Sequence, residues 1–259
     1  MRLWKSTKSK MKETKMKKYI QHIIFQFKRL LRTPGFLVPA IIFPAMFYSF
    51  FGANMVPEGV YSQYSVASFC IYGVLSIAFY QFGVGIAQDR ESAFDIWLKT
   101  LPASTIAKGI AQIISAMIFS LLAVGLVLLA SIFLAKTQLN SEMVIRLLII
   151  CAIVAIPASL MGVALGYFSN SRAAPALANL IFLPLAFLGG LWIPPIGLPK
   201  IVDEISIWTP TRQMAELGWS AINGQMADNR TLMMFAGYTI LFALIAFLLI
   251  LRDRQRRFA

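Results

Sequence analysis

Six long apolar segments, separated by short polar ones, constrain this chain more than any other feature. Each approaches or exceeds the roughly 20 residues that a helix needs to cross the hydrocarbon core of a bilayer. Hydrophobic residues make up 58% of the chain and charged residues only 14%, well below the ~25% charged residues of a soluble domain. The sequence therefore predicts an all-α integral membrane protein with six transmembrane helices. The six segments are residues 36–55, 65–86, 106–134, 143–168, 174–193 and 233–251.

The distribution of positive charge orients these segments. If the N-terminus lies inside and the chain crosses the membrane six times, 19 of the 24 Lys and Arg residues fall on the inner side. The positive-inside rule then predicts a protein of the inner (cytoplasmic) membrane with both termini in the cytoplasm. Anionic head groups of the inner leaflet account for the net charge of +13, so membrane lipids are expected partners and nucleic acid is not.

The N-terminal region divides into two parts before the six-span domain of residues 34–259. Residues 1–16 are expected to form a basic cytoplasmic tail that buries almost nothing. In residues 17–33, apolar side chains such as Ile20, Ile23 and Ile24 recur at helical spacing between basic ones. This pattern predicts an amphipathic helix at the cytoplasmic interface.

Two connections between the spans are longer than simple turns require. The outer segment 194–232 contains four prolines, which interrupt helices, and two tryptophans, which favour the head-group region. It predicts short helices that lie in the outer interface or re-enter the membrane before the last span. The inner segment 89–104 predicts a helix, because Phe94, Trp97, Leu98 and Leu101 share one face. Such an aromatic face either rests on lipid or inserts into a groove of another protein.

The central parts of the spans contain no Asp, Glu, Lys, Arg or His. Proton- or sodium-coupled transporters keep such groups near the middle of the membrane, and a membrane-embedded enzyme would need acids, a nucleophile or a metal. Cys70 and Cys151 lie within apolar segments and are expected to be buried, unpaired thiols. No G-x-x-x-x-G-K-[ST] phosphate-binding loop occurs in the sequence. We therefore expect a non-catalytic chain without a metal site, and if ATP drives it, another polypeptide must hydrolyse that ATP.

Three motifs occur in a characteristic order along the chain. Arg90-Glu91-Ser92-Ala93 begins the inner segment, Leu101-Pro102-Ala103-Ser104 ends it, and Ile207-Trp208-Thr209-Pro210-Thr211-Arg212-Gln213 precedes the last span. With the interfacial helix and the six spans, this order resembles the ABC type-2 transporter permease family over most of residues 17–259. Ala93 stands where the family commonly has glycine.

The resemblance implies the permease subunit of an ATP-driven ABC exporter. Such a subunit pairs with a second permease, either another copy or a homologue, and recruits ABC ATPase subunits that hold the ATP and Mg²⁺, so this chain needs no cofactor. Segment 89–104 would be the coupling helix that docks on the ATPase. Its implied coupling residues are Asp89, Arg90, Glu91, Phe94, Trp97, Leu98 and Leu101.

The resemblance also implies that the second and fifth spans line a pathway between the two permeases. Aromatic side chains with few polar groups would suit an amphipathic or hydrophobic cargo such as a drug, an antibiotic, a lipid or a peptide-like molecule. Ordinary packing between spans is the alternative role for each of these residues. The candidates are Phe69, Tyr72, Ser76, Phe79, Tyr80, Asn179, Phe182 and Phe187.

Two questions stay open at the level of the sequence. The G-x-x-x-G pattern from Gly162 to Gly166 permits close approach of two helices, either within one chain or between two. An ion-coupled secondary transporter and a non-transporting membrane assembly or sensor protein are the alternative functions. The missing charges disfavour the secondary transporter, whereas the assembly or sensor protein would need no pathway.

Overall fold

The computed structural model describes residues 24, 28, 34–54, 56, 59–92, 105–193, 197 and 199–258. The predicted tail 1–16, nearly all of the predicted interfacial helix 17–33 and most of the predicted coupling helix lie outside these residues. Within the described ranges all regular secondary structure is helical. The predicted all-α fold class is therefore confirmed.

The helices follow the apolar segments. They are α2 (Pro34–Phe47), the π-helix η1 (Tyr48–Gly52), α3 (Val60–Ile77), the π-helix η2 (Ala78–Val84), α4 (Gly85–Glu91), α6 (Thr105–Phe133), α7 (Ser141–Phe168), α8 (Ala174–Leu188) and α11 (Asn229–Phe258). Among the residues that the structure describes, four helical stretches are long and apolar enough to cross a membrane: Val60–Glu91, Gln112–Phe133, Ser141–Phe168 and Asn229–Asp253. The shorter apolar helices Ala40–Gly52 and Ala174–Leu188 correspond to the first and fifth predicted spans. The chain is a multi-pass membrane protein, and the number of six crossings stays a prediction.

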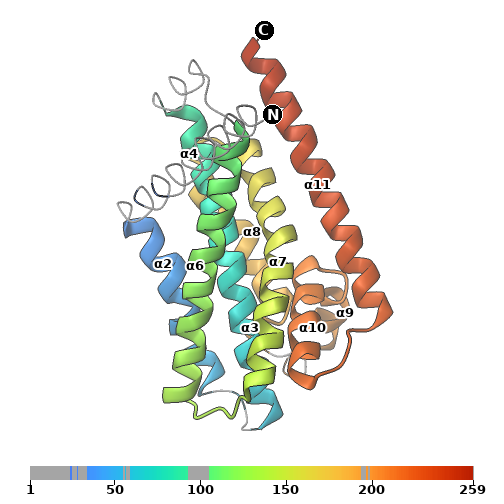
Figure 1. Cartoon of the computed structure of the whole chain (residues 1–259). Coiled ribbons are helices and arrows are strands. Elements are labelled where there is room, and N and C mark those ends of the chain that lie inside the picture. The colour runs from blue at the N-terminus through green and yellow to red at the C-terminus, as the bar shows by residue number, and fades with distance from the viewer. Residues whose placement is uncertain are drawn as a thin grey trace, which may run out of the picture.

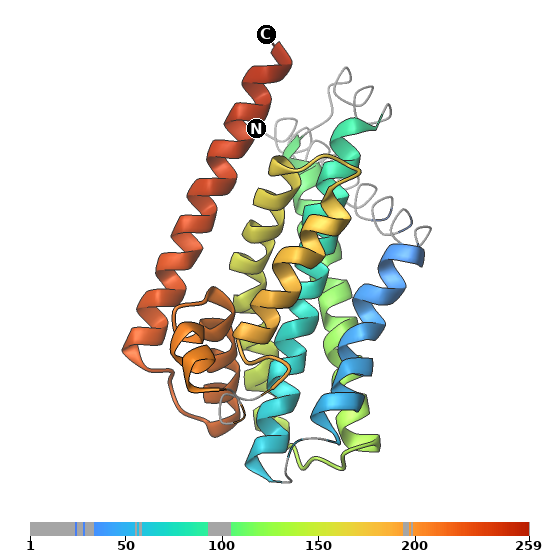
Figure 2. The same ribbon diagram turned by 180° about the vertical axis from the view of Figure 1, so that it is seen from behind.

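The second predicted span lies at the centre of the bundle. Its helix runs without a break through α3, η2 and α4, and 83% of its most apolar stretch is buried by neighbouring helices. Figures 1 and 2 show α2 and α6 on one side of it and α7 and α8 on the other. By contrast, only 6% of the apolar stretch of α11 is buried, because α11 packs mainly against α7 and α10. The last span therefore forms the edge of the bundle.

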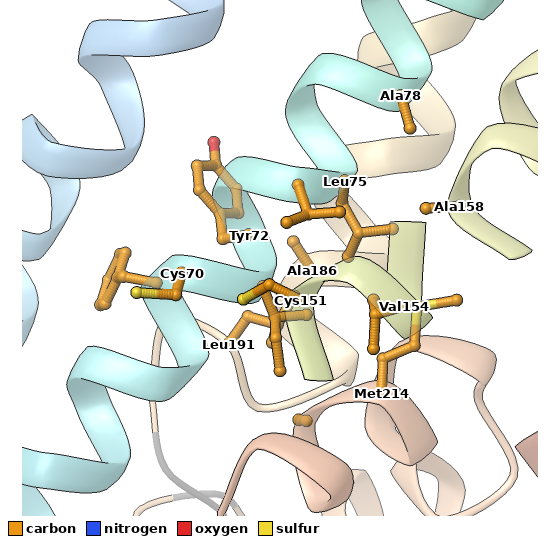
Figure 3. Close-up of a cluster of buried hydrophobic side chains, with 14 of the residues drawn as sticks. Cys70, Tyr72, Leu75, Ala78, Cys151, Val154, Ala158, Ala186, Leu191 and Met214 are labelled. Atoms are coloured by element: carbon orange, nitrogen blue, oxygen red, sulfur yellow. The ribbon is translucent and has the colours of Figure 1, made fainter. Parts of the chain in front are cut away.

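The main core forms where α3, α7, α8 and α10 (Pro210–Asn223) meet. Figure 3 shows Tyr72 and Leu75 of α3 close to Cys151 and Val154 of α7, with Met214 of α10 nearby. Both cysteines, Cys70 and Cys151, are buried and unpaired, as the sequence predicted.

The glycines of α7 allow this helix to contact η2 almost backbone to backbone. A Cβ atom on Gly162 would lie 2.3 Å from the carbonyl oxygen of Ala78, and one on Gly166 would lie 2.7 Å from that of Phe82. A side chain at either position would separate the two helices. The G-x-x-x-G pattern is therefore used for packing within one chain.

Two short helices, α9 (Lys200–Ser206) and α10, precede the last span, as predicted. Thr209 caps α10, because its side chain accepts a hydrogen bond from the backbone N–H of Arg212, and Pro210 occupies the first turn. Gly224 ends the helix in the left-handed conformation, with φ of 71°. Nearly every face of α10 is buried, and Figure 1 shows the helix between α7 and α11.

Candidate functional site

Arg90, in the last turn of α4, caps the C-terminal end of α7. Its Nη1 donates hydrogen bonds to the carbonyl oxygens of Gly166 at 2.8 Å, Tyr167 at 3.1 Å and Ser169 at 3.4 Å. The last carbonyls of a helix have no partner within the helix, and they carry partial negative charge. A guanidinium from a neighbouring helix supplies the missing hydrogen-bond donors and a compensating positive charge. The guanidinium also lies 5.0 Å from the centre of the Tyr167 ring.

The same guanidinium forms an ion pair with Asp253 of α11 through Nη2. Both side chains are partly buried, so solvent screens this pair less than a surface pair. We call Arg90, Asp253 and the carbonyls of Gly166, Tyr167 and Ser169 at the end of α7 the Arg90 clasp. It joins α4, α7 and α11 at one end of the bundle.

Glu91 makes a second attachment at this end. Its carboxylate accepts hydrogen bonds from the backbone N–H of Ser171, at 3.2 Å, and from the Ser171 hydroxyl. These bonds stabilise the ionised carboxylate and lower the pKa of Glu91. Ser171 lies in the connection between α7 and α8, so Glu91 ties the end of α4 to the point where the fifth predicted span begins.

The predicted coupling residues thus divide into two groups. Asp89, Arg90 and Glu91 were expected near the start of a separate helix, but they form the last turn of α4, which continues from the second span. Ser92 then has an extended backbone, with φ of −76° and ψ of 136°. Phe94, Trp97, Leu98 and Leu101 lie outside the described residues, so their placement stays a prediction.

Four of the predicted pathway residues in the second span are buried within the protein. They are Phe69, Tyr72, Ser76 and Phe79. The Tyr72 ring stacks on Phe182 of α8 with 4.9 Å between ring centres, and Phe79 contacts the same ring at 5.6 Å. Phe182 thereby connects the second and fifth predicted spans within one chain.

Three predicted pathway residues reach the surface. The Tyr80 hydroxyl donates a hydrogen bond to Oδ1 of Asn179 at 2.5 Å, which links η2 to α8. Asn179 is exposed, and Tyr80 and Phe187 are half-buried. Contacts between α3–η2 and α8 are therefore made by Tyr72 and Phe79 with Phe182, and by Tyr80 with Asn179. A role in lining a pathway stays a prediction for all of them.

Sequence reasoning missed Asp253 and Ser171 as partners of the Arg-Glu motif. Asp253 carried a signal, because it is the single acid among the last eight residues, which include four arginines. Ser171 carried no such signal, since a serine in a short connection is common and its partner Glu91 is 80 residues away in the chain.

Sequence reasoning also missed a polar network around Arg212 of α10. The guanidinium donates to Asp203 at 2.9 Å, to Ser206 at 2.8 Å and to Glu216 at 2.8 Å. It also lies 5.2 Å from the centre of the Trp219 ring, and Trp219 in turn donates through Nε1 to the Ser68 hydroxyl at 2.8 Å. This network holds α9 and α10 together and attaches them to α3.

Comparison with known proteins assigns the chain to a family. The sequence model of the ABC-2 type transporter family matches residues 20–220. The chain belongs to this family. A relative from Bacillus subtilis (strain 168), named "Putative transport permease YvfS", is 22% identical over 229 residues, which cover 86% of this chain and 93% of the relative. The chain is thus a transport permease subunit, and ABC-2 permeases in general work with an ABC ATPase as partner.

Proposed function

We propose that this permease is the membrane subunit of an ATP-driven exporter in the inner membrane, with both termini in the cytoplasm. A separate ABC ATPase would supply the energy, and a second permease, identical or homologous, would complete the transporter. The observation that carries this proposal is the double attachment of the end of α4 through Arg90 and Glu91.

The attachment provides a route for mechanical force. The predicted coupling helix begins at the end of α4, so a movement of that helix acts first on Asp89, Arg90 and Glu91. Arg90 would pass this movement to α7 and α11, and Glu91 would pass it to the start of α8. Four of the six predicted spans would then respond to one push from the ATPase. A permease that depends on a separate ATPase needs such a connection, because the movement of the ATPase must reach its spans.

The cargo route that fits this movement is a pathway between the two permeases, lined by the second and fifth predicted spans, α3–η2 and α8. Within one chain the aromatic side chains of these spans are packed together, because Phe182 contacts Tyr72 and Phe79. A shift of α8 relative to η2 would break the hydrogen bond between Tyr80 and Asn179 and expose these rings. An amphipathic or hydrophobic cargo, such as a drug, an antibiotic, a lipid or a peptide-like molecule, would then contact a surface of matching polarity.

The test of coupling compares two tryptophan variants. The tagged permease is isolated with its bound ATPase, and ATP hydrolysis is measured with and without a hydrophobic drug as cargo. We expect Trp97→Ala to reduce cargo-stimulated ATP hydrolysis at least tenfold, because an aromatic anchor in a groove is worth roughly 2 kcal/mol or more. Trp208→Ala is the matched control, since Trp208 is 65% exposed and lies beside α9, at the opposite end of the bundle. Equal behaviour of the two variants would refute the coupling role.

Transport assays separate the alternatives. Export that collapses with a protonophore and survives depletion of ATP would favour an ion-coupled secondary transporter. A protein that isolates without any ATPase and moves no cargo would favour an assembly or sensor role.

The proposed orientation has its own test. Cys70 and Cys151 are buried, so a single introduced cysteine can be labelled over a low background. In intact cells, a membrane-impermeant maleimide should label Trp208→Cys and leave Trp97→Cys unmodified. Labelling of the cysteine at position 97 from outside would overturn the whole proposal.

A further inference from the structure

A pocket of about 190 Å³ lies beside the Arg90 clasp, between the end of α7 and the C-terminal part of α11. Figure 1 shows these two helix ends at the same end of the bundle. The pocket is far larger than the ~10–15 Å³ that a single water requires. Its lining residues are Arg90, Tyr167, Phe168, Leu249, Arg252 and Asp253.

The pocket carries a surplus positive charge. Arg90 is paired with Asp253, so the charge of Arg252 is left over among the lining residues. Arg252 is exposed and forms no ion pair with any described residue. The carbonyls at the end of α7 would repel an anion, but the Arg90 guanidinium already satisfies them. An anionic group can therefore approach Arg252, and a guanidinium binds phosphate oxygens in pairs.

Most of the exposed lining is polar, and its apolar part comes from Tyr167, Phe168 and Leu249. Phe168 is 71% exposed, and the half-buried side chains of Tyr167 and Leu249 lie beside it. Exposed apolar side chains of α11, including Leu248, continue from Leu249 along the predicted span. A small soluble anion would leave these surfaces uncovered, whereas a molecule with an anionic head and hydrocarbon chains would use both parts of the pocket.

We propose that this pocket binds the phosphate group of an anionic phospholipid from the cytoplasmic leaflet. Arg252 contacts the phosphate, and Phe168 and Leu249 contact the hydrocarbon next to it. The inference rests on the proposed topology, which places this end of the bundle at the cytoplasmic surface, where anionic lipids are found. A lipid in this position touches both α7 and α11 and stabilises the attachment of the last span.

The experiment measures thermal unfolding of the full-length permease, purified without ATPase in a neutral detergent, after addition of phosphatidylglycerol or phosphatidylcholine. At a lipid concentration about 100 times the dissociation constant, we expect phosphatidylglycerol to raise Tm by about 5–10 °C more than phosphatidylcholine does. Arg252→Gln should abolish this difference. Leu249→Trp should also abolish it, because the larger side chain fills the pocket without changing any charge.

Arg172→Gln is the matched control. Arg172 is exposed in the connection between α7 and α8, at the same end of the bundle, and it does not line the pocket. This variant should keep the full difference between the two lipids. Equal losses in Arg172→Gln and Arg252→Gln would overturn the proposal, because they would indicate diffuse attraction to a basic surface.

Two further outcomes would also overturn it. An unchanged response of Leu249→Trp would place the lipid elsewhere. Equal stabilisation by soluble glycerol 3-phosphate would indicate a site for a free anion instead of a lipid. Because the assay contains neither ATPase nor cargo, its failure is distinct from a failure of the proposed export function.

Discussion

Replacement of Gly162 by alanine tests the contact between α7 and η2 at the centre of the bundle. The new Cβ atom would lie 2.3 Å from the carbonyl oxygen of Ala78, 3.0 Å from its carbonyl carbon and 3.0 Å from Cβ of Phe82. Two of these three atoms belong to the backbone of a buried helix. They cannot rotate away as the tip of a flexible side chain can, so the two helices must separate.

The magnitude follows from two opposing effects. Alanine favours a helix over glycine by about 1 kcal/mol, and overpacking of a buried contact costs about 1–3 kcal/mol. Gly125 of α6 provides the control, because nothing lies within 4 Å of a Cβ atom built there. Gly125→Ala therefore gains the helix propensity without the clash. The difference between the two variants isolates the clash, about 1–3 kcal/mol, or about 2–12 °C in Tm.

Thermal unfolding in one detergent, followed by tryptophan fluorescence, measures this difference. Gly125→Ala should unfold at or slightly above the temperature of the parent protein, and Gly162→Ala should unfold at or below it. If both variants unfold at the same temperature, α7 and η2 do not approach as closely as described, and the assignment of the G-x-x-x-G pattern to packing within one chain is wrong.

Two further variants test the attachments at the two ends of the bundle. Asp253→Asn should weaken the clasp by about 1 kcal/mol, because the Arg90 guanidinium then donates to a neutral amide oxygen instead of a carboxylate. Cargo-stimulated ATP hydrolysis should fall while the ATPase still co-purifies, and Asp253→Glu should restore it. Unchanged stimulation in Asp253→Asn would count against force transmission to α11. Trp219→Phe should lower stability by about 1–2 kcal/mol in thermal unfolding, because the buried Ser68 hydroxyl loses its donor. An unchanged Tm would show that this bond does not hold α10 against α3.

The sequence predicted the helical class and the approximate position of each apolar helix, because hydrocarbon length and apolar composition leave few choices. It did not predict where an α-helix becomes a π-helix or where a helix ends. The second span was predicted to end at residue 86, yet its helix includes a π-helical stretch and continues to Glu91. Apolar content marks where a helix leaves the bilayer, but it does not mark where the hydrogen-bonded helix ends.

The candidate site shows a similar limit. The motif around Arg90 was recognised, but its partners were not, since they lie in α7 and α11. A pairing between distant segments depends on the tertiary arrangement, and periodicity within one segment contains no information about it. The grouping of Tyr72 with Phe182 came from the family resemblance, and the structure places their rings in contact.

The Arg90 clasp also bears on how this protein is made. Arg90 precedes Gly166, the first residue whose carbonyl it binds, by 76 residues. The ribosome therefore synthesises the capping arginine long before the helix end that it caps. When the end of α7 is synthesised, the arginine that caps it is already present in the chain. Asp253 is synthesised 163 residues after its partner, so the ion pair can form only after α11 has been made. A chain truncated before α11 would keep the hydrogen bonds from Arg90 to the end of α7 and would lack the ion pair with Asp253.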